Sequence, residues 1–284
     1  MRATSNPVFK NLPRQEVGGY AGFGSGAAAA GQAGYQYGNQ QYPQQYQQPY
    51  PQAPTRSLTI DDVVTKTGIT LGVLALSALV TYLLTNANNA LAPMFVIGGG
   101  IIGLVLVLVA TFGNKADNPA IVLSYAVAEG VFVGALSFMF TDISFGGAGG
   151  ASMIGQAILG TFGVFAGMLV VYKTGAIRVT PRFTRMLIGA MIGILVLVVG
   201  NLIASFFVDG GFGLRDGGPI AIIFSLVVIA IAAFSFLLDF DAADQLIRAQ
   251  APPKAAWGVA LGLTVTLVWL YVEILRLLSY FQSD

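Results

Sequence analysis

Four carboxylates lie inside long apolar stretches of this 284-residue chain, and they are the residues best placed to do chemistry. Glu129 lies within PAIVLSYAVAEGVFVGALSFMF, Asp239 and Asp241 end AIIFSLVVIAIAAFSFLLDFD, and Glu273 lies within LGLTVTLVWLYVEILRLLSYF. A charge in hydrocarbon is costly, so acids in such places usually mark an ion path, a proton relay or a binding site. The pattern predicts a membrane protein whose function depends on these acids.

The composition excludes several classes of enzyme. The chain contains no His and no Cys. It therefore lacks the residues for a serine-hydrolase triad, an HExxH metalloprotease site, a thiol nucleophile or a Cys-ligated zinc ion. An intramembrane aspartyl protease needs two aspartates at membrane depth, whereas Asp216 of GFGLRDGG lies in a short loop with different spacing. We expect a protein that is not an enzyme and that uses no cofactor.

Seven apolar segments are long enough to carry these acids across a membrane. A helix needs about 20 apolar residues to cross about 30 Å of hydrocarbon. The chain is 55% hydrophobic and only 10% charged, whereas soluble domains carry about 25% charged residues. The sequence predicts an all-α bundle of transmembrane helices over residues 59–284, at about 65–85, 92–113, 119–141, 153–172, 186–208, 219–240 and 256–281.

Local signals place the starts of three of these helices. Thr59 followed by Asp61 and Asp62 is typical of an N-cap with an acidic first turn. Pro119 and Pro219 fit the first turn of the third and sixth helices, where the missing N–H has no partner to lose.

Residues 1–58 differ in kind from the rest. A Gly/Ala stretch leads into a Tyr/Gln/Pro stretch, QYGNQQYPQQYQQPYPQAP. Such a tract buries too little aliphatic surface to offset its chain entropy, so the sequence predicts a disordered tail. It serves either as a plain tether or as a tyrosine-rich interaction tail. It has no apolar signal-peptide core, so we expect the first helix to direct membrane insertion.

The basic residues predict an orientation. If the seven segments span the membrane, 12 of the 14 Lys and Arg residues fall on the side of the N-terminus, and only Arg215 and Arg276 fall on the other. Cytoplasmic loops carry the excess of Lys and Arg, so the N-terminus is expected in the cytoplasm and the C-terminus outside. The net charge of +1 makes nucleic acid an unsuitable partner. The lipid bilayer is the expected environment.

Each acid has a purely structural and a functional interpretation. Glu129 lies ten residues into its segment, about 15 Å deep. It is either a neutral acid hydrogen-bonded to a neighbouring helix or part of an ion or proton site. Glu273 lies towards the outer side, with Arg276 three residues later, which favours a local ion pair. Asn201 and Thr266 either line a path or bridge helices.

The end of the sixth segment, LLDFDAADQLIR, concentrates acids. If the helix continues, one face carries Asp241, Asp244, Gln245 and Arg248, while Asp239 points elsewhere. Carboxylate oxygens suit a hard cation, so Ca²⁺ is the metal favoured near Asp241. Clustered acids also make a proton switch without histidine. The alternative is a solvated helix end with an Asp244–Arg248 pair.

Several motifs together resemble the Bax inhibitor-1 family, over about residues 60–281. They are a Tyr-x-x-x-Glu-Gly-x-x-x-Gly segment, an aromatic-Asp segment with a following Gln, and the final WLYVEILRLL, with the residues Tyr125, Glu129, Gly130, Gly134, Phe240, Asp241 and Gln245. The opening TSNPVF and the Gly/Gln/Tyr-rich extension are similar to the bacterial branch of that family.

The resemblance implies six helices around a central seventh. It also implies a pH-sensitive Ca²⁺ leak gated by two aspartates, on helices six and seven. Asp241 matches the first aspartate, but Thr266 stands at the second, and the second helix has no arginine to match the usual basic partner. Glu129 is a hypothetical replacement for the missing acid.

Two functions are expected from these features. The first is a proton-modulated cation leak in a bacterial cell membrane, with Asp241 as gate acid, Glu129 at the midplane, and Asp239 and Asp244 in a cytoplasmic vestibule. The second is a non-conducting regulator that binds a membrane protease or stress and cell-death machinery, as some family members are thought to do.

Overall fold

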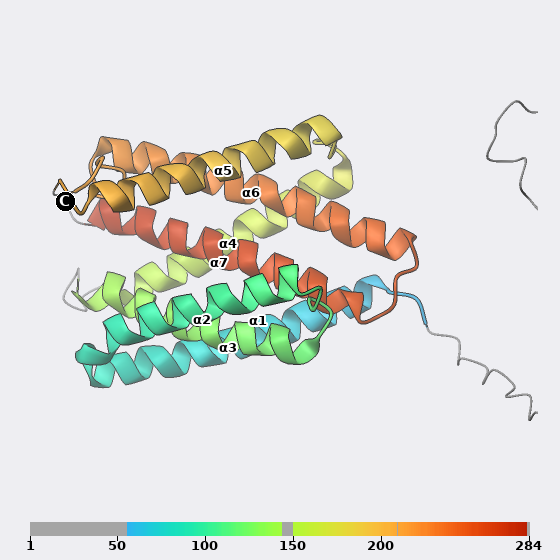
Figure 1. The fold of residues 1–284 in the computed structure, drawn as a ribbon, viewed down its shortest axis with the longest axis horizontal. Coiled ribbons are helices and arrows are strands. Elements are labelled where there is room, and N and C mark those ends of the chain that lie inside the picture. Colours follow the sequence, from blue (N-terminus) through green and yellow to red (C-terminus); the bar gives the residue numbers. More distant parts are fainter. Residues whose placement is uncertain (1–55, 144–149, 209, 283–284) are drawn as a thin grey trace, which may run out of the picture. The chain divides into compact units, whose positions relative to one another are not determined.

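Seven long helices make up the described part of the chain. The structure, a computed structural model, describes residues 56–143, 150–208 and 210–282, and within these ranges it contains no strand. The helices are α1 (Ile60–Ala87), α2 (Ala92–Phe112), α3 (Pro119–Phe138), α4 (Gly150–Thr174), α5 (Pro181–Ala204), α6 (Pro219–Arg248) and α7 (Ala255–Gln282) (Figure 1). The predicted all-α fold with seven spans is confirmed. The predicted disordered tail falls almost wholly outside the described residues.

Local chemistry sets the helix starts as the sequence predicts. Thr59 caps α1: its hydroxyl accepts from the Asp62 N–H at 3.3 Å, and the Asp62 carboxylate accepts from the Thr59 N–H at 3.1 Å. This reciprocal pair satisfies two N–H groups that the first turn leaves free. Pro119 and Pro219 lie in the first turns of α3 and α6.

Helix α7 is the centre of the bundle. It packs against α1, α3, α4 and α6, and 72% of the residues in its most apolar stretch are buried, against 11% in α4. Helices α1, α2 and α3 lie on one side of α7, and α5 and α6 lie on the other (Figure 1). The expected central seventh helix is therefore present, although α5 packs mainly against α6 and lies at the outside.

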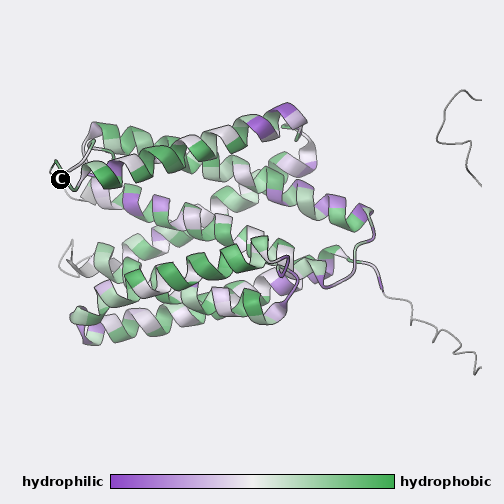
Figure 2. Ribbon diagram, in the orientation of Figure 1, coloured by the Kyte–Doolittle hydropathy of each residue, from purple (hydrophilic) through white to green (hydrophobic). Residues whose placement is uncertain are grey.

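The outward surfaces of the helices are apolar. Large side chains such as Ile97, Leu104 and Leu195 are more than half exposed. Figure 2 shows the hydrophilic residues gathered mainly towards the helix ends, with apolar residues along the middle. Such surfaces are stable against lipid rather than water. The chain is an integral membrane protein.

Glycines allow close helix crossings on one side of α7. A Cβ on Gly99 would lie 2.7 Å from the Phe132 backbone nitrogen, and one on Gly130 would lie 2.5 Å from the Leu74 carbonyl oxygen. These contacts join α2 and α1 to α3, as small residues do in membrane bundles. In contrast, a Cβ on Gly163 or Gly167 of α4 would meet no atom within 4 Å.

Helix α6 is longer than its apolar segment. The segment was expected to end near residue 240, but the helix continues to Arg248. Hydropathy marks where hydrocarbon ends, whereas backbone hydrogen bonding continues through the polar sequence that follows. As a result Asp239 and Asp241 lie within the helix, about 14 Å and 11 Å from its end.

Candidate functional site

Asp239 of α6 and Thr266 of α7 meet at the interface between these two helices. The Thr266 hydroxyl donates to the Asp239 carboxylate at 2.7 Å, and the Gly262 carbonyl of its own helix lies 3.2 Å away as a second acceptor. Gly262 lies beside the acid, since a Cβ there would be in ordinary van der Waals contact with Asp239 Oδ1 at 3.6 Å. Thr266 is buried and Asp239 is partly buried.

The structure places Asp239, not Asp241, opposite Thr266. Sequence matching paired Asp241 with Thr266 and assigned Asp239 to the vestibule. Instead, Asp241 accepts from the Gln245 side chain at 2.6 Å, one turn further along its own helix. The physical reason is helical phase, since two residues along a helix turn a side chain by about 200°.

The pattern of buried residues along α6 shows which face of the helix is turned towards its neighbours. Its buried residues recur at spacings of three and four, at Ala221, Ser225, Val228, Ala232 and Phe236. Three residues after Phe236 the same stripe reaches Asp239. The burial of the folded helix therefore places Asp239 on the face towards α7, a phase that the almost uniformly apolar sequence of this segment does not reveal.

Asp244 lies on the exposed side of the end of α6. It pairs with Arg248 at 2.7 Å, and the Tyr172 hydroxyl of α4 lies 3.5 Å from the same carboxylate oxygen. This is the solvated pair considered as the alternative for this segment. Among the described residues, no three acidic side chains are grouped so that they could hold a metal ion, including around Asp241.

Glu129 lies against the backbone of α2. The space for its carboxylate exists because residue 103 is glycine: a Cβ there would lie 2.6 Å from Glu129 Oε2. Tyr125, one turn earlier on α3, is its polar neighbour. Glu129 is partly buried and forms no ion pair within the part of the chain that the structure describes.

Glu129 and Asp239 lie at different helix interfaces. Glu129 faces Gly103 of α2, whereas Asp239 faces Thr266 and Gly262 of α7. Helix α3 meets α7 through other residues, since Ala126 and Val133 cluster with Val268. This arrangement gives Glu129 no direct contact with Thr266 to replace the second family aspartate.

Glu273 belongs to a buried ion pair near the other end of α7. Arg276 donates to Glu273 at 2.6 Å, and the side chains are 13% and 4% exposed, respectively. Ser225 of α6 donates to the second carboxylate oxygen at 2.7 Å. The predicted local pair is present, but it is enclosed in protein. Ser225, which completes it, was not found from sequence.

Contacts to the α6–α7 loop hold the adjoining ends of these two helices at the Lys/Arg-rich end of the bundle. Lys66 of α1 donates to the Pro253 carbonyl at 3.2 Å, and the Leu58 N–H donates to the Ala251 carbonyl at 2.8 Å. Lys254 pairs with Asp117 of the α2–α3 loop at 2.6 Å. The hydrogen bond from Lys254 holds the pKa of the Asp117 carboxyl below its usual value.

Comparison with known proteins identifies the family to which the chain belongs. A sequence model described as Bax inhibitor 1 like matches residues 6–283, which is nearly the whole chain. A search of curated proteins found no match. The match supports the resemblance drawn from the motifs and covers all seven helices.

Proposed function

Because the chain belongs to the Bax inhibitor 1 like family of integral membrane proteins, we propose that it is a proton-controlled cation leak with Asp239 as its gate acid. Ca²⁺ is the favoured ion, and the bacterial cell membrane is the proposed location. Asp239 takes the role that sequence matching gave to Asp241.

The contact between Asp239 and Thr266 is the observation that carries this proposal. Asp239 lies inside a transmembrane helix, and its partner is a neutral hydroxyl rather than a cation. Within the described residues, Asp239 forms no ion pair. Its charge is therefore compensated by hydrogen bonding alone, which is unusual for an acid at membrane depth.

The same contact accommodates both protonation states. When Asp239 is charged, the Thr266 hydroxyl donates to it. When Asp239 is protonated, the acid donates to the Thr266 oxygen, and Thr266 donates instead to the Gly262 carbonyl at 3.2 Å. Both states keep their hydrogen bonds, so the site changes charge without leaving a buried donor or acceptor unsatisfied.

An apolar seal separates this site from the second acid between α6 and α7. Asp239 and Ser225, the partner of Glu273, lie about 21 Å apart along α6. Between these levels Ala232, Phe236 and Leu270 are fully buried in one cluster. In this conformation the interface is closed to a hydrated ion. Conduction requires that α6 move relative to α7, and the charge on Asp239 biases that movement.

Calcium is proposed as cargo rather than as a resident ion. The single carboxylate of Asp239, which has no cation partner among the described residues, supplies oxygen ligands without a closed cage. Weak binding is what conduction requires, because an ion must leave as easily as it enters.

Calcium uptake by proteoliposomes tests the proposal. Wild-type protein should admit Ca²⁺ at a rate that changes between about pH 6 and pH 8, and Asp239→Asn should make the rate independent of pH because its side chain does not titrate. Uptake equal to that of empty liposomes, with protein shown to be folded, would reject the leak and favour a non-conducting regulator.

We also propose that the Lys/Arg-rich end faces the cytoplasm, which puts the N-terminus inside and the C-terminus outside. The chain has no cysteine, so single cysteines report sidedness without background. In intact cells a membrane-impermeant thiol reagent should label Ser205→Cys, between α5 and α6, but not Ala249→Cys, at the other end of α6. The reverse pattern would invert the orientation.

A further inference from the structure

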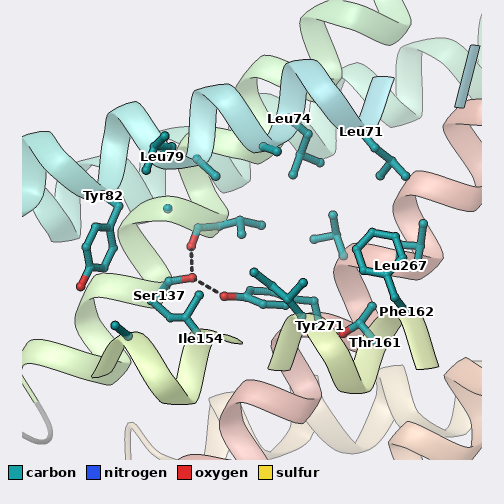
Figure 3. Close-up of a pocket in the computed structure, with 17 residues that line it drawn as sticks. Leu71, Leu74, Leu79, Tyr82, Ser137, Ile154, Thr161, Phe162, Leu267 and Tyr271 are labelled. Carbon is teal, nitrogen blue, oxygen red and sulfur yellow. Dashed lines mark hydrogen bonds between the residues drawn. The ribbon is translucent and has the colours of Figure 1, made fainter. Parts of the chain in front are cut away.

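An apolar cavity of about 450 Å³ lies between α1, α3, α4 and α7, away from the acids (Figure 3). Its volume falls within the range of about 300–1,000 Å³ that is typical of ligand sites. Its floor is formed by buried residues of the bundle, including Val133, Leu267 and Val268. Leu79 of α1 and Phe162 of α4 line it too, and about half of each side chain is exposed.

The exposed rim makes the cavity continuous with the lipid-facing surface. Both α1 and α4 span the membrane, so their exposed apolar side chains lie among acyl chains. A molecule that enters past Leu79 and Phe162 therefore comes from the hydrocarbon of the bilayer rather than from water.

Three polar side chains that line the cavity, Ser137, Thr161 and Tyr271, already form hydrogen bonds within the protein. Ser137 donates to the Val133 carbonyl at 2.7 Å, so its contact with Tyr271 at 2.8 Å must use the tyrosine proton (Figure 3). Thr161 donates to the Ala157 carbonyl at 2.7 Å. Among the residues that the structure describes, no Lys, Arg, Asp or Glu lines the cavity. The lining thus offers no counter-charge to an ion or a headgroup, but it suits a hydrocarbon.

The dimensions suit one chain. The lining of α1 runs from Leu71 to Tyr82, which is about 16 Å along the helix. Spread over that length, the volume corresponds to a mean cross-section of about 30 Å². This elongated space accommodates a single extended alkyl chain.

We propose that this cavity is a binding site for one acyl chain of a membrane phospholipid. The chain would pack between α1 and α4 against Leu267 and Val268 of α7, with its headgroup at the membrane surface. The site does not depend on whether the protein conducts ions. Burial of the chain's methylene groups against protein rather than lipid gains packing, not hydrophobic transfer, so retention depends on how well the cavity fits.

Native mass spectrometry of the full-length protein tests this. In a detergent that strips loosely held lipid, wild type should retain one phospholipid per chain. Ala78→Phe should lose it, because Ala78 lines the cavity and a benzyl group there would occupy the site. The matched control Ala166→Phe, on an exposed position of α4 outside the lining, should keep it.

A second variant controls for the possibility that Ala78→Phe misfolds. Ala75 also lines the cavity but is exposed, so Ala75→Phe adds its bulk without straining the core. Lipid retained in both Ala75→Phe and Ala78→Phe, or no phospholipid in wild type, would overturn the proposal. A phospholipid that appears only after removal of residues 1–55 would also overturn it, because the N-terminal segment would then be the natural occupant.

Discussion

The two carboxylates between α6 and α7 are held in opposite ways. Glu273 is enclosed, with a cation 2.6 Å away and a hydroxyl on its other oxygen. Asp239 has a neutral hydroxyl at 2.7 Å and no ion pair among the described residues. The Arg276 cation compensates the charge of Glu273, whereas the Thr266 hydroxyl can hydrogen-bond Asp239 in either protonation state. The first is suited to structure and the second to control.

Removal of the cation at Glu273 should have the largest effect on stability. Arg276→Met removes the cation paired directly with the buried Glu273 carboxylate, which should lower the free energy of unfolding by about 3–5 kcal/mol. Thermal unfolding in detergent would measure the change. The control Arg248→Met breaks the exposed pair with Asp244 and should cost less than about 1 kcal/mol. Equal losses in the two variants would mean that the Glu273 pair is not enclosed as described.

Glycine substitutions extend the comparison to Glu129. Gly99→Ala should cost about 1–3 kcal/mol, because its Cβ would press on the backbone of α3. Gly103→Ala should cost less, because it meets only the tip of the Glu129 side chain, which can move. Gly163→Ala, which meets open space, should be neutral or slightly stabilising. A larger loss at Gly103 than at Gly99 would show that Glu129 is fixed rather than free to move.

Loss of the hydroxyl beside Asp239 should have an effect on folding stability that depends on the charge of the acid. Thr266→Val removes the hydrogen bond to the acid and should cost about 1.5–3 kcal/mol if Asp239 is charged, and about 1 kcal/mol if it is neutral. Thr264→Val is the matched control, since its hydroxyl bonds only to Ala260 of the same helix. Unfolding followed against pH in both variants would separate these cases. Identical behaviour at every pH would contradict a special role for the Asp239–Thr266 contact.

Breaking the exposed ion pair between Asp117 and Lys254 should have the smallest effect on folding stability. Its hydrogen bond lowers the pKa of Asp117 in the folded state, so its stabilisation is present above the usual carboxyl pKa and is lost as the pH falls through the lowered value. Asp117→Asn should therefore unfold at a slightly lower temperature than wild type at pH 7, and the difference should begin to shrink near pH 4 and disappear below the lowered pKa of Asp117. A difference that persists in acid would assign the effect to packing instead.

The fold followed from the sequence because its signals are local and strong. Apolar length gave the seven spans, and Thr59, Pro119 and Pro219 marked helix starts that the structure confirms. The family assignment also held over residues 6–283. These features depend on composition and on chemistry within one helical turn.

The candidate site was only partly predictable because it depends on rotation between helices. Asp239, Asp241 and Thr266 are candidates from sequence alone, but which acid faces the threonine depends on the rotation of α6 relative to α7. Ser225 was missed for a similar reason, since it lies 48 residues from Glu273 and meets it only through packing. The cavity beside Tyr271 has no sequence signal, because four separate helices form it.

Asp239, and not Asp241, should carry the pH response of the protein. The most direct test compares Ca²⁺ uptake by liposomes that contain wild type, Asp239→Asn or Asp241→Asn at equal protein density, between about pH 6 and pH 8. We predict that Asp239→Asn loses the pH dependence while Asp241→Asn keeps it, because only Asp239 faces Thr266 across the α6–α7 interface. Loss of the response in Asp241→Asn with a normal response in Asp239→Asn would contradict the account.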